Sequence, residues 1–227
     1  MSDILLNKSI TYFGLGDRLD ALLIGKMLYD RDKEPVTFHQ LRGSFRDFEF
    51  LTSLYELEAK IEYPRQKEIK HSTFFEHNSK GFDQKKLLRS VEDFPKIKPY
   101  DFNINLPDNF ITVQFDGKQR SRTACSKKEI KRIKSFYKDQ GYKLITVGGE
   151  ATNVSLKGST ECIPYIIYYM SKAKLHVGID SGMMNLAKLV MPCSNMHIYT
   201  SDSDDFKSSI LCRCEEKGTK INYSRNL

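Results

Sequence analysis

The chain has 227 residues, of which 40% are hydrophobic and 11% aromatic, so it can bury a core and does not have the composition of a disordered protein. No apolar run reaches the roughly 20 residues that a membrane-spanning helix needs, and the start MSDILLNKSITYF does not resemble a secretory signal peptide. Five irregularly spaced cysteines favour free thiols in a reducing compartment, so we expect a cytoplasmic protein.

The net charge of +7 is distributed unevenly along the chain. Residues 1–109 contain 17 Lys/Arg and 18 Asp/Glu, whereas residues 110–227 contain 19 Lys/Arg and 11 Asp/Glu. A basic second half suits an anionic partner such as a nucleotide phosphate, nucleic acid or an anionic glycolipid. A solvated basic surface accounts for the same excess, and the sequence leaves both interpretations open.

The N-terminal segment predicts a strand, a glycine loop, a helix and a second strand. The β-formers Ile10–Phe13 precede Gly14 and Gly16, and the apolar residues that follow have helical spacing. Pro35 follows the helix, and Val36–Phe38 start the next strand. This order is typical of a βαβ unit.

Residues 40–100 have a weaker pattern. The stretch DFEFLTSLYELEAKI (residues 47–61) predicts a helix, and Gln84–Val91 predicts a short helix within otherwise irregular structure. The stretch KPYDFNINLPDN (residues 98–109) is typical of a connection. We therefore expect an N-terminal domain at residues 1–105 and a C-terminal domain at residues 106–227.

The second half predicts a regular alternation of strands and helices. Strands are expected at FITVQF, KLITV, KLHVGI and NMHIYT, with helices after Ser126, in STECIPYIIYYMSKA and in SGMMNLAKLVM. Ser126 and Glu129 have the spacing of a capping box, and Gly141 stands where a helix ends. The order predicts a parallel sheet with helices on both faces, whose ligands bind beyond the carboxyl ends of the strands.

Gly14, Gly16 and Asp17 follow the first predicted strand. A dinucleotide fingerprint needs a small residue where Leu19 stands, so a nicotinamide or flavin cofactor is not expected. The glycines let another group approach the backbone closely. Asp17 either caps the helix or removes a proton from an acceptor hydroxyl.

Two further loops follow predicted strands. Lys118, Arg120 and Arg122 crowd the first of them, where their cations either bind phosphate or simply face solvent. Gly148-Gly149-Glu150 follows the next strand. Its glycines permit close approach of a base or ribose and its carboxylate can accept hydrogen bonds from ribose hydroxyls, although an ordinary turn has the same sequence.

Asp180-Ser181-Gly182-Met183 stands at the junction between a strand and a helix. A helix N-terminus presents free N–H groups and a partial positive charge, so it can hold a diphosphate, to which Ser181 can donate through its hydroxyl. The alternative is that Asp180 or Ser181 only caps the helix.

These stretches together resemble the bacterial heptosyltransferase family, the ADP-heptose–lipopolysaccharide glycosyltransferases. The resemblance lies in GLGDRLDALLIGKML (residues 14–28) and in Leu156–Pro192, and it covers about half of the chain. The second stretch is similar to the family's pattern of Leu-x-Gly, a helix, a strand, Asp-Ser-Gly-x-x-His-Leu-Ala and a Pro. The resemblance implies an α/β fold of GT-B type, with two Rossmann-like domains with parallel sheets, of which the N-terminal domain is reduced.

The resemblance also implies an inverting, metal-independent transfer of a sugar from a nucleotide-diphospho-sugar to a hydroxyl acceptor, without a cofactor. In this reading Asp17 is the general base. The donor diphosphate would be bound by Ser181, Gly182, Met183 and one or more of Lys118, Arg120 and Arg122. Asn185 stands where the family has His, and an amide hydrogen-bonds but does not titrate.

Two acceptor classes are open. The family suggests a surface or lipid-linked glycan, whereas the high Lys content and the basic segment 60–98 favour DNA with a hydroxymethylated base. A third possibility is a catalytically degenerate GT-B module that binds a nucleotide or nucleic acid. No feature of the sequence specifies the sugar or an oligomeric state.

Overall fold

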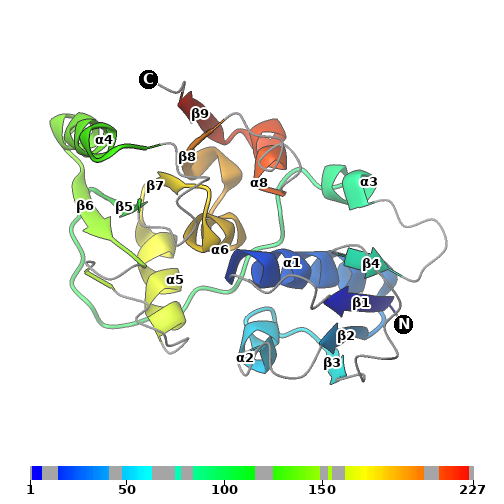
Figure 1. Ribbon diagram of the computed structural model, residues 1–227. Coiled ribbons are helices and arrows are strands. Elements are labelled where there is room, and N and C mark those ends of the chain that lie inside the picture. The colour runs from blue at the N-terminus through cyan, green and yellow to red at the C-terminus, as the bar shows by residue number, and fades with distance from the viewer. Residues whose placement is uncertain are drawn as a thin grey trace. The chain divides into compact units, whose positions relative to one another are not determined.

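The computed structural model describes residues 2–6, 15–40, 48–62, 75–77, 84–115, 125–148, 153–154, 162–201 and 210–224. The chain forms two compact units, residues 1–98 and 99–227 (Figure 1). Both combine strands and helices, as expected for an α/β protein.

The first unit contains a four-stranded sheet in the order β3-β2-β1-β4. Its strands are β1 (Ser2–Leu6), β2 (Val36–Gln40), β3 (Ala59–Glu62) and β4 (Phe75–His77). β1, β2 and β3 run parallel, whereas β4 pairs antiparallel with β1. The parallel sheet expected for the N-terminal domain is present in β1, β2 and β3, and the antiparallel strand at its edge departs from that expectation.

Helix α1 (Leu15–Asp32) lies between the parallel strands β1 and β2, so this unit has the order βαβ with its first strand at Ser2–Leu6. The predicted strand at Ile10–Phe13 lies outside the described residues, and the strand described before α1 is β1. Helix α2 (Phe48–Ser53) is shorter than predicted, since Glu56 has a left-handed φ of 51° and the chain then extends into β3. Helix α3 (Gln84–Arg89) lies at the position expected for the short helix.

The second unit contains a five-stranded parallel sheet in the order β6-β5-β7-β8-β9. The strands are β5 (Phe110–Gln114), β6 (Lys143–Thr146), β7 (His176–Ile179), β8 (Met196–Ser201) and β9 (Lys220–Ser224). The helices are α4 (Lys127–Asp139), α5 (Ile163–Lys172), α6 (Gly182–Val190) and α8 (Ile210–Arg213), with single turns η3 (Cys193–Asn195) and η4 (Glu215–Lys217). The parallel sheet predicted for this half is confirmed, and β9 adds a strand that the sequence analysis did not predict.

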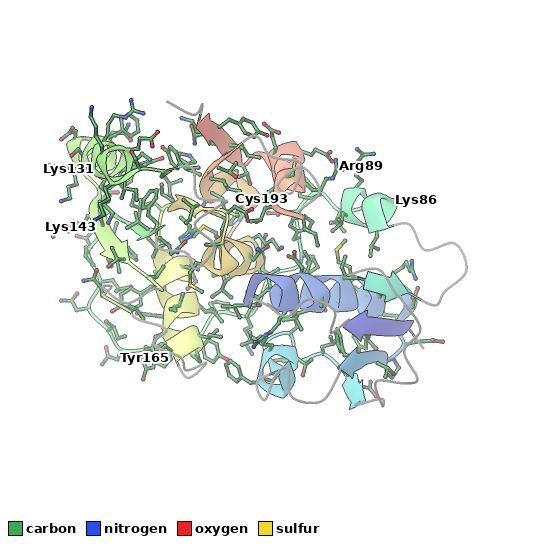
Figure 2. The ribbon with its side chains drawn as sticks, viewed as in Figure 1. Lys86, Arg89, Lys131, Lys143, Tyr165 and Cys193 are labelled. Atoms are coloured by element: carbon green, nitrogen blue, oxygen red, sulfur yellow. The ribbon has the colours of Figure 1, made fainter. Side chains whose placement is uncertain are left out.

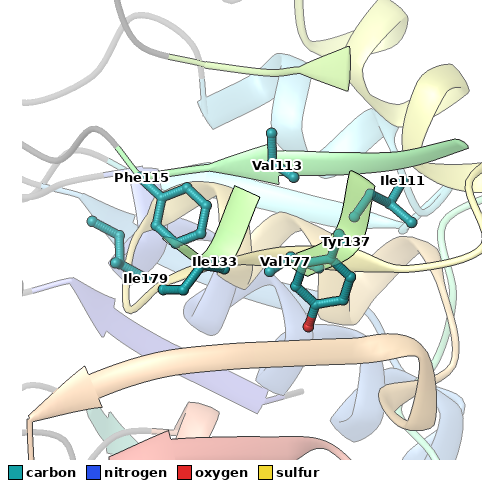
Figure 3. Close-up of a cluster of buried hydrophobic side chains, with 7 residues drawn as sticks. All are labelled: Ile111, Val113, Phe115, Ile133, Tyr137, Val177 and Ile179. Carbon is teal, nitrogen blue, oxygen red and sulfur yellow. The ribbon is translucent and has the colours of Figure 1, made fainter. Parts of the chain in front are cut away.

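Helix α4 covers one face of this sheet. Ile133 and Tyr137 of α4 pack against side chains of β5 and β7 and against Phe115 (Figure 3), a cluster completed by Ile111, Val113, Val177 and Ile179. The predicted capping box is present: Ser126 Oγ accepts from Glu129 N at 3.2 Å, and Glu129 Oε2 accepts from Ser126 N at 2.8 Å. Gly141, with φ 83°, follows the helix as expected.

The segment that leads into β5 is held against α5. The ring of Phe102 stacks on that of Tyr165 with 4.5 Å between centroids, and Tyr168 Oη donates to the carbonyl of Ile104 at 3.3 Å. Residues 99–105 therefore cluster with the second unit.

Strand β6 is one of the two edge strands of this sheet, and Asn153 and Val154 lie beside its end. Val147 forms a parallel bridge with Val154. Asn153 Oδ1 accepts from Thr146 N at 3.0 Å, and Asn153 N donates to Thr146 Oγ1 at 2.9 Å. These bonds occupy backbone groups at the end of the edge strand.

Gly178 determines how closely β7 lies against β5. A Cβ atom at Gly178 would be 2.5 Å from the backbone oxygen of Gln114. We expect Gly178→Ala to lower the free energy of unfolding by about 1–3 kcal/mol, because backbone must move to make room.

Chemical denaturation checks this expectation. Gly141→Ala is the comparison, since the nearest atom to its Cβ would be 4.0 Å away and only its left-handed φ of 83° disfavours alanine. A Gly178→Ala protein as stable as the wild type would contradict the close approach.

Candidate functional site

In the second sheet, the direction in which successive strands are added reverses between β5 and β7, although all the strands run parallel. β5 is followed along the chain by β6 on one side, whereas β7, β8 and β9 lie on its other side. The connections that leave β5 and β7 therefore diverge, and such a switch point is where open parallel sheets bind ligands. Gln114 ends β5, and Asp180 and Ser181 follow β7.

A hydrogen bond joins the two strand ends at this switch point. Ser181 Oγ donates to Gln114 Oε1 at 2.7 Å, and it also accepts from the backbone N–H of Met184 at 3.4 Å as the N-cap of α6. The capping role of Ser181 is thus confirmed. Its hydroxyl proton is directed at Gln114, so donation to a ligand requires this bond to be exchanged.

The start of α6 leaves two backbone donors for another group. Ser181 Oγ satisfies Met184 N–H, and the Ser181 carbonyl accepts from Asn185 N at 3.0 Å. The amides of Gly182 and Met183 donate to no other residue in the described part of the chain. Adjacent free N–H groups at the positive end of a helix can bind an anionic oxygen.

Gly148 lies next to this helix start. It has φ 71°, and a Cβ there would be 2.7 Å from Met183 Cγ and 3.7 Å from Gln114 Cγ. The structure thus brings the predicted residues Gly148, Met183 and Ser181 together. The Met183 side chain fills the space beside Gly148. The glycine therefore makes room for Met183 and does not leave the backbone open to a ligand.

Asn185 and Lys188 extend the polar contacts along α6. Asn185 Nδ2 donates to the Ser181 carbonyl at 3.3 Å, and its Oδ1 accepts from Lys188 Nζ at 2.5 Å. The Lys188 side chain is fully buried although it ends in an amino group. Asn185 therefore links this buried amino group to the residue that caps the helix.

Thr112 and His176 form a second buried polar pair, on neighbouring strands. Thr112 Oγ1 lies 3.0 Å from His176 Nδ1. The Nε2 atom of His176 is buried and has no hydrogen-bond partner among the described residues. Burial lowers the pKa of His176 to about 3, so the ring is neutral near pH 7.

Sequence reasoning missed Gln114, Lys188 and His176. Gln114 is a polar residue at the end of the mostly apolar strand FITVQ, and Lys188 lies within the apolar helix stretch LAKLV. A polar residue inside an apolar pattern was the available signal, since such residues need a specific partner when they are buried.

The structure places only part of the predicted site residues. Gly16 and Asp17 lie in the first turn of α1, although the side chain of Asp17 is outside the described part. Also outside the described residues are Gly14, Lys118, Arg120, Arg122, Gly149 and Glu150. Their proposed roles stay predictions.

Within the described ranges, no group of three or more His, Cys, Asp or Glu side chains has the arrangement of a metal site. None of the helices described combines the length and apolar character needed to cross a membrane. No family model matches the chain, and no curated protein or solved structure proves similar to it.

His176 predicts a specific pH dependence of stability. Its folded-state pKa of about 3 lies below the value near 6.5 of an unfolded histidine, so the unfolded chain binds the proton first as the pH falls. The stability that comes from a neutral His176 is therefore present above about pH 6.5 and is lost progressively below it, by up to about 1.4 kcal/mol per pH unit.

The variant His176→Asn removes this titration. Between pH 6.5 and 5, its free energy of unfolding should fall less steeply than that of the wild type in urea titrations. Parallel pH profiles for the two proteins would show that His176 takes up its proton equally well in the folded state.

Proposed function

We propose that this chain is a glycosyltransferase that uses a nucleotide-diphospho-sugar donor, and that the donor diphosphate binds at the N-terminus of α6. The observation that carries the proposal is the pair of amides at Gly182 and Met183, which have no acceptor among the described residues and lie at the switch point of a parallel sheet. The resemblance of residues 14–28 and Leu156–Pro192 to heptosyltransferases supports the same assignment.

The surroundings of the two amides suit a leaving diphosphate. They lie at the positive end of a helix of nine residues, and the bond between Ser181 and Gln114 fixes the helix start against β5. We assign further stabilisation of the developing charge to Lys118, Arg120 and Arg122, which follow β5 in the sequence. Side-chain cations would then stabilise the negative charge of the leaving diphosphate, as a metal ion does in other transferases.

The proposed reaction is a direct displacement at the anomeric carbon. The carboxylate of Asp17 removes the proton from the acceptor hydroxyl, whose oxygen forms the new glycosidic bond. The bond between the anomeric carbon and the diphosphate oxygen breaks, and the electron pair leaves with the nucleoside diphosphate. The configuration at that carbon is inverted. A glycan hydroxyl and the hydroxymethyl group of a modified DNA base both supply the required acceptor.

A second candidate function is that of a degenerate module that binds a nucleotide without transfer. The observation that favours it is Asn185, which stands in place of the family's His and whose amide bonds to Ser181 and Lys188. An amide in this position supports the helix start but moves no proton.

The two N-cap serines provide a test of the donor site. Ser181→Ala and Ser126→Ala each remove a helix cap, and each should lower stability by about 1 kcal/mol. Only Ser181→Ala should weaken nucleoside diphosphate binding, because only α6 begins at the proposed site. Isothermal titration with ADP, UDP and GDP measures this difference, and equal affinities in both variants would remove α6 from the site.

The proposed base gives a second test. Asp17→Asn keeps the size of the side chain but removes its basicity, so sugar transfer should fall by about 100-fold or more while donor affinity stays within about twofold. Turnover of a sugar nucleotide measures the first quantity and calorimetry the second. Undiminished turnover would exclude Asp17 as the base. Donor binding without any turnover in the wild type would favour the degenerate module.

A further inference from the structure

Helix α4 carries a row of four lysines along its length. Lys127, Lys131, Lys134 and Lys138 are spaced at i, i+4, i+7 and i+11, so they lie on one side of the helix and span about 16 Å. Three of the four are exposed, and Lys134 is half-buried with its Nζ 5.9 Å from the centroid of the Phe115 ring. Lys128 and Arg132 add two exposed cations beside them. Figure 2 shows Lys131 on α4 and Lys143 on β6, the strand that follows α4.

This lysine row lacks neutralising partners within the described residues. None of its four members forms an ion pair with another described side chain. The two acids of α4 do not compensate: Glu129 accepts the capping-box bond from Ser126 N at 2.8 Å, and Asp139 forms no ion pair within the described ranges. The helix therefore presents an uncompensated positive side.

Such an arrangement costs helix stability. Like charges three or four residues apart destabilise a helix by about 0.2–0.5 kcal/mol per pair. Lys127 and Lys128 also lie in the first turn, at the positive end of the helix dipole. An anionic partner would offset these repulsions, whereas packing of α4 against the sheet uses Ile133 and Tyr137, which lie roughly 100° around the helix from the lysine row.

The apolar side of α4 is already occupied. Ile133 and Tyr137 are buried against the sheet, and the only large apolar side chain exposed on this helix is Phe136, at 49%. An amphipathic helix that binds a bilayer inserts its apolar side, which α4 cannot present. A row of four cations can instead contact about four phosphates of a nucleic acid, whose backbone carries one negative charge per nucleotide.

We propose that the lysine row of α4 binds the phosphate backbone of nucleic acid, without reading its sequence. This inference goes beyond the transfer chemistry and holds whether or not the chain transfers a sugar. It gives a function to part of the positive charge of residues 110–227. Six of the Lys and Arg residues in this half lie in α4.

Fluorescence anisotropy with a DNA duplex of about 20 base pairs tests the proposal. If about four phosphates are contacted, the plot of log K against log salt concentration should have a slope near −3.6. The variant with Gln at all four positions of the row should have a slope near zero and bind at least about tenfold more weakly at low salt.

A charge-matched variant provides the control. It replaces four exposed lysines outside α4 with Gln: Lys33, Lys98, Lys172 and Lys174. It should keep the slope and affinity of the wild type. The row variant should melt at the same temperature as the wild type or higher, because neutralisation removes repulsion within α4, so that weaker binding does not reflect unfolding.

Three results would overturn the inference. They are an unchanged slope in the row variant, an equal loss in the control variant, and wild-type binding to vesicles with anionic lipid but not to the duplex. Nucleoside diphosphate affinity, measured without DNA, should be the same in the wild type and the row variant. A chain that binds the duplex through the row but binds no nucleotide would refute the proposed function and leave this inference standing.

Discussion

The close pairing of β5 with β7 is the constraint on which the second unit depends. Gly178 has no side chain, and a Cβ atom there would lie only 2.5 Å from the carbonyl oxygen of Gln114. This approach puts the end of β7 next to the end of β5, where Ser181 reaches Gln114. The contact between Ser181 and Gln114 fixes the position where α6 starts. It thereby also fixes the direction of the amides of Gly182 and Met183.

A helix cap and an anion site are not competing interpretations at this junction. Ser181 satisfies the N–H of Met184, while the amides of Gly182 and Met183 remain without a described acceptor. A single capping side chain accounts for only part of the donors that a helix start exposes. The same residue can therefore stabilise the fold and leave binding capacity beside it.

Local signals made much of the second unit predictable from sequence. The capping box at Ser126 and the strand-to-helix junction at Ser181 involve residues that are neighbours in sequence, so the local sequence predicts both features. The partners of Gln114 and His176 lie more than 60 residues away, and only the folded sheet reveals them. In the first unit, β1 was not predicted, since the first strand was expected at Ile10–Phe13, and β3 and β4 were missed because strands of three or four residues show little alternation.

The return of the chain beside β6 has a consequence for association between molecules. An edge strand offers unpaired N–H and C=O groups to any other extended chain. Here Asn153 bonds to Thr146, and Val154 bridges to Val147. Lys143 adds an exposed charge at the beginning of the same strand. The edge is thereby blocked at one end and charged at the other, which opposes the strand-to-strand aggregation to which open parallel sheets are prone.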